Sequence, residues 1–299
     1  MASDLSGPYR HNCMNPPPLS TGLSEVVPGR TRLNAGDSAS ADITHHGGQV
    51  LSWVGGGKER LFVSPRAVFK AGHPIRGGIP VIFPQFADGG TGLRHGFARL
   101  MDWEPLPHRG TGVAGRAEAR FALVANERTL QTWPHLFHAE LTVNLTPNQL
   151  SVTLRIENLD RRDFVFTAAL HTYLRVSNVG TVSLSGLENH PYIDSANGGR
   201  RHAGPDNPLR FNGEIDRIYP AASNELLLRD GSDTLRIRSH GFRDTVVWNP
   251  GRTLAAGMSD LGEDQFAHFA CVESGVVSTP CVVAAGATWQ AAQILSIVS

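Results

Sequence analysis

Two arginines and a histidine lie close together in a segment rich in glycine and proline. Residues 75–99 read IRGGIPVIFPQFADGGTGLRHGFAR, with Arg76 before a Gly-Gly turn, His95 four residues from the end and Arg99 at the end. Guanidinium groups stay charged at any working pH and offer forked donors suited to phosphate or carboxylate, and an imidazole titrates near neutrality. The segment is typical of a polar binding site on a rigid β framework. Taken singly, each arginine could equally be a surface charge and the histidine a structural turn residue.

A second histidine and a glutamate occur in two strand-like segments and could move protons. His171 follows the apolar run at 168–170, and Glu273 follows Cys271-Val272 at the end of another apolar stretch. An imidazolium can give a proton and take it back. A carboxylate, with an ordinary pKa of about 4.3, becomes a better base when partial burial raises its pKa. The plainer alternatives are a solvent-facing glutamate and a hydrogen-bonded structural histidine, one of 13 in the chain.

The elements that would position these side chains are β-strands. Apolar and polar residues alternate over 137–145 and again over 150–156, which is the period of a half-buried strand. Pro147-Asn148-Gln149 suits a hairpin between these two runs, and Asp230-Gly231 suits another between 226–228 and 235–237. No stretch shows a sustained helical period, and 32 glycines and 19 prolines divide the chain into short segments. The sequence therefore predicts an all-β fold, a large antiparallel sandwich.

Length and composition favour one domain. A chain of 299 residues with 40% hydrophobic residues can bury a large single core. The first 30 residues are turn-rich and aperiodic, with three consecutive prolines at 16–18. We expect residues 1–30 to form an extended or disordered arm without a catalytic role, and residues 31–299 to form a single domain.

The charge balance excludes several classes of partner. Lysine plus arginine and aspartate plus glutamate each total 27, so no net basic charge favours nucleic acid or an anionic membrane. No apolar run approaches the ~20 residues of a membrane span, and the N-terminus lacks the pattern of a secretory signal. The histidines at 45–46, 135 and 138 lack the accompanying ligands of a metal site.

The cysteines indicate a reducing compartment. Cys13, Cys271 and Cys281 are odd in number and lack zinc-like spacing, which fits free thiols, although Cys271 and Cys281 could in principle be bridged. We expect a cytoplasmic protein.

Six segments together carry a family resemblance. They are RGGIPVIFPQF at 76–86, HGFAR at 95–99, ALHTYLRV at 169–176, GEIDRIY at 213–219, VVWNP at 246–250 and MSDLGEDQFAHFACVES at 258–274. In the order and separation of these segments, the chain resembles the hexose-6-phosphate mutarotases of the galactose mutarotase-like superfamily. These enzymes are also called glucose-6-phosphate 1-epimerases. The resemblance extends from about residue 35 to the end of the chain. It implies a β-supersandwich with the site on an open concave face.

The resemblance also implies a reaction. It is the cofactor-free interconversion of the α and β anomers of an aldohexose 6-phosphate, with glucose 6-phosphate as the expected substrate. A proton leaves the C1 hydroxyl while another reaches the ring oxygen, the ring opens to an aldehyde, and rotation and reclosure give the other anomer. By resemblance, Glu273 is the base and His171 the acid.

The remaining site residues follow from the same resemblance. His95 would hydrogen-bond the sugar, Asp216 would accept from a sugar hydroxyl, and Arg76 and Arg99 would hold the 6-phosphate. Arg94 stands where many relatives have glutamine, so it could add a third phosphate contact or lie in solvent. We expect a monomer that binds a hexose 6-phosphate and neither nucleic acid nor membrane.

Two other functions stay open at this point. In a mutarotase of unphosphorylated sugars, Arg76 and Arg99 would be structural. In a noncatalytic carbohydrate-binding or sensor protein on the same fold, His171 and Glu273 would serve only as sugar ligands. The presence of both an acid and a base argues against the second.

Overall fold

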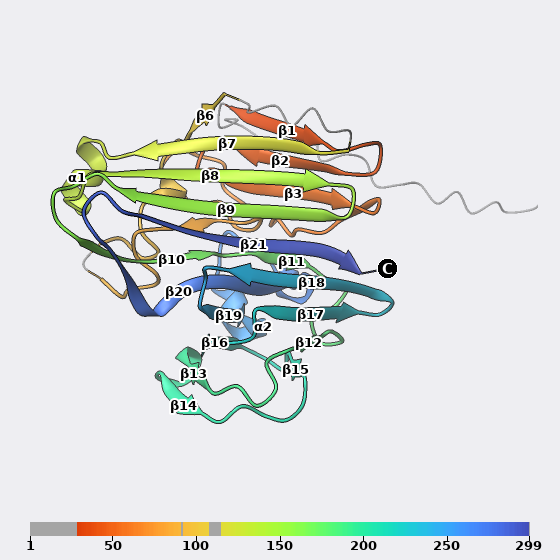
Figure 1. The fold of residues 1–299 in the computed structure, drawn as a ribbon. Helices are drawn as coiled ribbons and strands as arrows, with labels where there is room; N and C mark the ends of the chain where they lie inside the picture. Colours follow the sequence, from red (N-terminus) through yellow and green to blue (C-terminus); the bar gives the residue numbers. More distant parts are fainter. Residues whose placement is uncertain (1–28, 91, 108–114, 299) are drawn as a thin grey trace, which may run out of the picture.

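The protein is built from three β-sheets whose neighbouring strands run antiparallel (Figure 1). The computed structural model describes residues 29–90, 92–107 and 115–298. The expected N-terminal arm, residues 1–30, lies outside the described residues except for its last two, as does Cys13. The predicted all-β class is confirmed.

The strands and helices have the following bounds. The four-stranded sheet has the order β1 (Arg30–Asn34), β2 (Ser40–Thr44), β3 (Gln49–Gly55) and β4 (Lys58–Glu59). The eight-stranded sheet has the order β14 (Arg200–His202), β13 (Tyr192–Asp194), β16 (Ile215–Pro220), β19 (Asp244–Asn249), β20 (Phe269–Val283), β10 (Phe164–Leu170) and β5 (Val81–Ile82), with β11 (Tyr173–Arg175) also paired to β20. The nine-stranded sheet has the order β15 (Leu209–Arg210), β12 (Ser183–Ser185), β17 (Glu225–Asp230), β18 (Asp233–His240), β21 (Thr288–Val298), β9 (Gln149–Asn158), β8 (Phe137–Thr146), β7 (Ala117–Val124) and β6 (Glu104–Leu106). Short helices are α1 (Glu127–Thr132), α2 (Gly251–Ala256) and the 3-10 turns η1 (Ala98–Leu100), η2 (Ser195–Asn197) and η3 (Gln265–His268).

Both predicted hairpins are present. Strands β8 and β9 pair up to Thr146 and Gln149, so the turn is Pro147-Asn148 and Gln149 already belongs to β9. Strands β17 and β18 close with Asp230 opposite Asp233. Along β8 every second residue is buried, as the alternation of apolar residues predicts.

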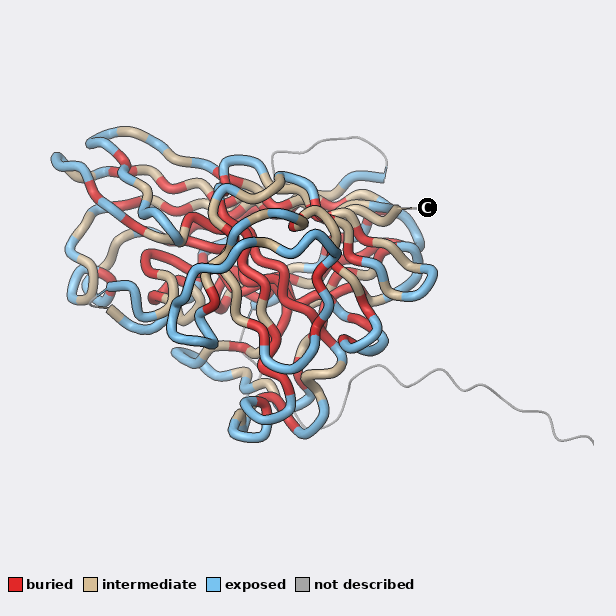
Figure 2. Tube along the Cα trace, turned by 90° about the horizontal axis from the view of Figure 1, so that it is seen from below, coloured by how far each residue is buried: buried red, intermediate tan, exposed pale blue. Residues whose placement is uncertain are grey.

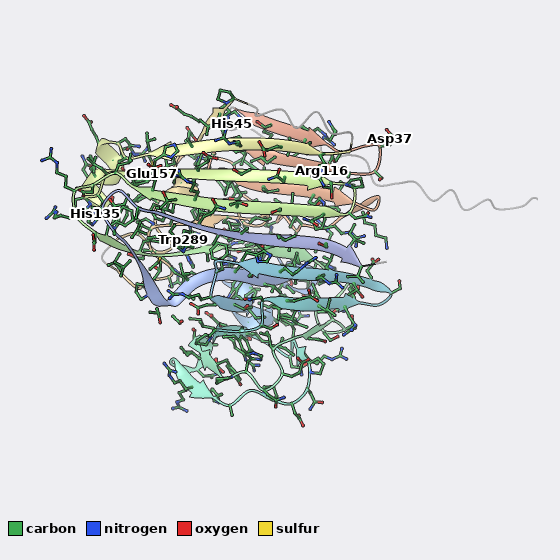
Figure 3. All side chains as sticks on the ribbon, viewed as in Figure 1. Asp37, His45, Arg116, His135, Glu157 and Trp289 are labelled. Atoms are coloured by element: carbon green, nitrogen blue, oxygen red, sulfur yellow. The ribbon has the colours of Figure 1, made fainter. Side chains whose placement is uncertain are left out.

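The core lies between the sheets. In Figure 1 the nine-stranded sheet runs across the front, with the other two sheets behind it, and Figure 2 shows the buried stretches gathered in the middle of the molecule. One apolar cluster takes fully buried side chains from all three sheets, among them Trp53, Leu141 and Val272. Trp289 of β21, labelled in Figure 3, packs edge-on against Phe166 of β10 at 5.1 Å between ring centroids. Burial of this apolar area is the main force that holds the sheets together.

Helices contribute little to the described part of the chain. Each of the two α-helices has six residues, and within the described ranges no helix is long and apolar enough to cross a membrane. The two described cysteines, Cys271 and Cys281, are free.

Candidate active site

One face of the eight-stranded sheet carries the predicted acid–base chemistry. Asp216 of β16 pairs with Trp248 of β19, and Trp248 pairs with Cys271 of β20, two residues before Glu273. Directly paired residues share a face, and so do residues two apart on one strand. Their neighbour Val272 points the other way, into the main core. The period of the strands therefore separates the site from the core.

His171 is brought to Glu273 by two successive strands, β10 and β11, which both pair with β20. In these pairings Leu170 lies opposite Ser274 and Tyr173 opposite Cys271. His171 lies in the short link between the two strands, and its Nε2 is 3.4 Å from Oε1 of Glu273. Two atoms of the pair, His171 Nδ1 and Glu273 Oε2, are buried without a hydrogen-bond partner among the described residues.

The surroundings of this pair favour its uncharged forms. Glu273 is 1% exposed and His171 8%. Burial, helped by the charge of Asp216, raises the pKa of Glu273 well above its ordinary value. Burial, the neighbouring His95 and the charges of Arg76 and Arg99 lower the pKa of His171 well below its ordinary value. Both shifts act in the same sense, favouring an uncharged carboxyl group and an uncharged imidazole over an ion pair.

His95 is held as a neutral imidazole. The Ala87 N–H donates to His95 Nδ1 at 3.3 Å. Burial, followed by the charges of Arg99, Arg94 and Arg76, lowers the pKa of His95 to about 3. A neutral ring that accepts at Nδ1 carries its hydrogen on Nε2, so His95 offers an N–H donor. Its ring centroid is 5.8 Å from that of His171.

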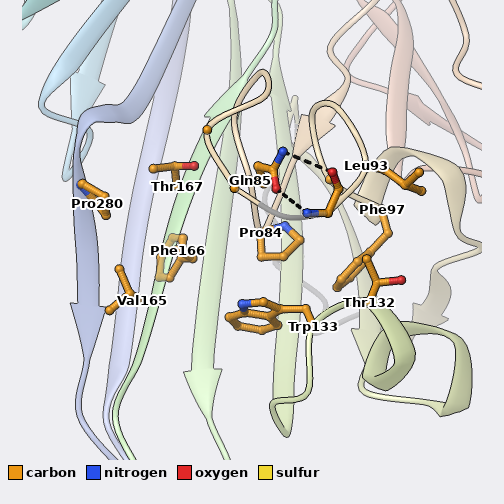
Figure 4. A pocket seen from close by; sticks show the side chains of 14 residues that line it. Pro84, Gln85, Leu93, Phe97, Thr132, Trp133, Val165, Phe166, Thr167 and Pro280 are labelled. Atoms are coloured by element: carbon orange, nitrogen blue, oxygen red, sulfur yellow. Dashed lines mark hydrogen bonds between the residues drawn. The ribbon is translucent and has the colours of Figure 1, made fainter.

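The side chain of Gln85 organises the loop that carries His95. Its Oε1 accepts from the Gly92 N–H at 2.9 Å, and its Nε2 donates to the Gly92 carbonyl at 3.4 Å (Figure 4). The same Nε2 donates to the Ala87 carbonyl at 3.0 Å. A Cβ on Gly90 would lie 2.4 Å from Gln85 Oε1, so a side chain there would displace the Gln85 amide. His95 itself has a φ of 63°, a left-handed conformation that this closed loop imposes.

A pocket of about 290 Å³ borders this loop. Figure 4 shows its wall, which includes Pro84, Gln85, Phe97 and Trp133. None of the site residues predicted from the sequence lines it, so it is separate from the acid–base pair.

The two predicted phosphate ligands have different partners. The Arg76 Nε and Nη2 each lie 3.1 Å from Asp260 Oδ2, and Nη1 donates to the hydroxyl of Tyr173 at 3.1 Å. Burial opposes the charge of Arg76, but Tyr173 and Asp260 outweigh it and raise its pKa above the ordinary value. Arg99 donates to the Arg94 carbonyl at 2.9 Å, and its Nε is buried without a partner among the described residues.

Arg99 is the least compensated cation of the group. Burial lowers its pKa to about 10, with Tyr173 and Asp260 opposing and Arg76 and Arg94 adding to the effect. It still carries its charge at neutral pH. Arg94 is exposed and paired with Asp88, which places it at the rim. Burial raises the pKa of Asp216, with Arg94 opposing.

The structure thus gathers His171, Glu273, His95, Arg76 and Arg99 at one place. Sequence reasoning assigned no role to three further residues there: Tyr173, Asp260 and Gln85. All three lie inside the segments that carry the family resemblance, but segment matching gives no contact to distinguish them from core residues. Among the described residues, no three histidine, cysteine, aspartate or glutamate side chains are grouped to hold a metal ion.

Comparison with solved structures defines the class of the protein. A crystal structure from Salmonella typhimurium described as a "putative mutarotase" superimposes with a TM-score of 0.81 and 26% sequence identity, covering 93% of this chain and 96% of that chain. The fold is that of the mutarotase-like β-supersandwiches, as predicted.

Comparison of sequences defines the family. Residues 30–296 match the model of the family described as "Aldose 1-epimerase", and the chain belongs to this family of isomerases. A Cenchrus ciliaris protein named "Putative glucose-6-phosphate 1-epimerase" is 36% identical over 290 residues, which cover 93% of this chain and 86% of that protein. An Escherichia coli (strain K12) protein of the same name is 33% identical over 246 residues, covering 80% of each chain.

Proposed function

We propose that this protein interconverts the α and β anomers of an aldohexose 6-phosphate, with glucose 6-phosphate as the first candidate. The observation that carries the substrate class is Arg99. Its guanidinium is half-buried beside Arg76 and makes no ion pair among the described residues, whereas Arg76 is paired with Asp260. A phosphate dianion would supply the missing counter-charge, and forked guanidinium donors suit it. The names of the two relatives support the same substrate.

The reaction needs one base and one acid and no cofactor. Glu273 takes the proton of the C1 hydroxyl while His171 gives a proton to the ring oxygen. The bond between C1 and the ring oxygen breaks, and the C1 oxygen becomes the aldehyde carbonyl. After rotation about the C1–C2 bond, the same two protons return and the ring closes as the other anomer. The single pair serves both directions.

The charge of the substrate would favour the protonation states that Glu273 and His171 need for this reaction. The productive form has an ionised Glu273 and a protonated His171, which are the charged forms that burial disfavours. A phosphate on Arg76 and Arg99 would offset two of the cations that lower the pKa of His171. We therefore infer that phosphate binding favours transfer of the proton from Glu273 to His171.

Other side chains would orient the sugar. The Nε2–H of His95 is a donor for a ring or hydroxyl oxygen, and Asp216 is an acceptor for a sugar hydroxyl. Trp248, whose ring lies 5.8 Å from that of His171, offers an apolar face to the sugar. We keep a monomer in the cytoplasm as part of the proposal, and the free thiols of Cys271 and Cys281 agree with a reducing compartment.

Replacing Arg99 tests the substrate class. Arg99→Ala should raise the KM for glucose 6-phosphate by ~10- to 100-fold, the value of a charge-assisted hydrogen bond. It should change the slower conversion of glucose much less. The measurement is anomer exchange by NMR over a range of concentrations of each sugar.

Arg94→Ala is the local comparison for this experiment. Arg94 is exposed and already paired with Asp88, so its loss should have the smaller effect. If Arg99→Ala stays folded but loses activity on both sugars in parallel, Arg99 positions the site generally and the hexose phosphate assignment is wrong.

A further inference from the structure

Tyr173 contacts both functional ends of the site. Its hydroxyl accepts a hydrogen bond from Arg76 Nη1 at 3.1 Å. Its ring stacks on the imidazole of His171, with 4.9 Å between centroids and 10° between planes. One side chain therefore joins the arginine assigned to the phosphate and the histidine assigned to the ring oxygen.

The position of Tyr173 is fixed by its own strand. It pairs with Cys271 in β20, its N–H donates to the Gly78 carbonyl at 2.9 Å, and its carbonyl accepts from the Phe62 N–H at 3.0 Å. The side chain packs against Phe269 at 5.1 Å between ring centroids, and the residue is 2% exposed. Because Tyr173 is itself fixed, its contacts can fix the positions of Arg76 and His171.

The chemistry of the substrate explains why these two ends need a fixed spacing. In a hexose 6-phosphate, the phosphate is carried by C6, C6 is bonded to C5, and C5 bears the ring oxygen. A group that protonates the ring oxygen must therefore stand close to the group that binds the phosphate. A small error in that spacing would bring the acid out of reach of the ring oxygen.

We propose that Tyr173 is a positioning residue that sets the preference for phosphorylated aldoses, through its hydroxyl on Arg76 and its ring on His171. This inference rests on the proposed function. The two contacts belong to different parts of the side chain, so two substitutions separate them. Tyr173→Phe removes the hydroxyl and keeps the ring, and Tyr173→Leu removes both.

The two variants should change different kinetic constants. For Tyr173→Phe we expect the KM for glucose 6-phosphate to rise on the order of 10-fold, because Arg76 loses one hydrogen bond but keeps Asp260. The ratio of kcat/KM for glucose 6-phosphate to that for glucose should fall by a similar factor. For Tyr173→Leu we expect kcat to fall ~10- to 100-fold on both sugars, because His171 loses the surface that orients it.

Tyr219→Phe is the matched control. Tyr219 is also a buried tyrosine on the eight-stranded sheet, its ring centroid lies 5.3 Å from that of Tyr192, and it belongs to the main core rather than to the site. Its substitution should leave both kinetic constants unchanged. Thermal unfolding of all three variants reports whether they fold.

The outcomes separate this inference from the proposed function. A Tyr173→Phe protein that keeps the full preference for glucose 6-phosphate would overturn the inference alone. The same shift in Tyr219→Phe would also overturn it, because it would show a general effect of losing a buried hydroxyl. Equal handling of both sugars by the unmodified protein would overturn the proposed function, and this inference with it.

Discussion

Glu273 is a carboxyl group in surroundings that disfavour its charge. Its strand places it on the site face, where it is almost completely buried. The negative charge of Asp216 acts on it there and further disfavours its ionised form. The same burial makes it a strong base once it is ionised, because a carboxylate with a raised pKa holds a proton more tightly. The role therefore depends on His171, which can take the proton at 3.4 Å.

Glu273→Gln tests that role. The amide keeps the volume of the side chain but cannot accept the C1 proton, so we expect anomer exchange to fall ~10²-fold or more. The measurement is NMR exchange of glucose 6-phosphate at saturating concentration. A rate within a few-fold of the unmodified protein would remove Glu273 from the mechanism.

The pH dependence of the stability of Glu273→Gln tests separately whether the pKa of Glu273 is raised. Because folding raises the pKa of Glu273 above its ordinary value, its contribution to stability is complete at pH values below that ordinary value and declines as the pH rises. The variant has no such group. Its free energy of unfolding, relative to that of the unmodified protein, should therefore increase from pH 4 toward pH 8. A change in the opposite direction would contradict the raised pKa.

The site depends on elements of two kinds, and only one kind is local in sequence. Hairpins β8–β9 and β17–β18 could be predicted because their turns and alternating residues are adjacent in the chain. Strand β20 pairs with β10, β11 and β19. Strands β10 and β11 lie about a hundred residues before β20 in the chain, and no local sequence pattern specifies these pairings. Residue types and a family resemblance predicted which side chains meet, but not the contacts between them. The pKa shifts also depend on burial, which only the assembled sheets provide.

The loop from Gln85 to His95 shows what motif reading does not reveal. FPQF and HGFAR each mark a conspicuous segment, yet the hydrogen bonds of the Gln85 side chain are made to Ala87 and Gly92, which lie between the two segments. His95 then receives its tautomer from the Ala87 N–H. A pocket borders the loop, so hydrogen bonds rather than packing hold that side of it.

Gln85→Ala should therefore loosen His95. We expect a loss in kcat on the order of 10-fold, because a displaced donor no longer meets the sugar. The ¹⁵N signals of the His95 ring should also shift away from a single Nε2–H tautomer, which NMR can follow without substrate.

Asn158→Ala is the control for this change. Asn158 is a buried amide that likewise makes three hydrogen bonds to backbone groups, those of Asp160, Arg162 and Val283. It is not among the residues of the site. Equal losses of activity in both variants, or an unchanged His95 signal in Gln85→Ala, would show that Gln85 acts only on stability.

At the scale of the whole molecule, positive charge is concentrated locally rather than spread over the surface. The chain has equal numbers of acidic and basic residues, so no net charge attracts an anion from a distance. Three arginines nonetheless influence the single histidine His95. We expect a preference for phosphosugars to arise from this cluster, with a salt dependence smaller than that of an exposed ion pair because the cluster is partly desolvated.

The central claim is that the protein accelerates anomer exchange and prefers a phosphorylated aldose. The most direct measurement is NMR of the exchange between α and β anomers of glucose 6-phosphate and of glucose, with and without the unmodified protein. We expect clear acceleration for glucose 6-phosphate and much weaker acceleration for glucose. Equal acceleration of the two sugars would contradict the phosphate site. Binding of glucose 6-phosphate without any acceleration would contradict catalysis and favour a sugar-phosphate sensor.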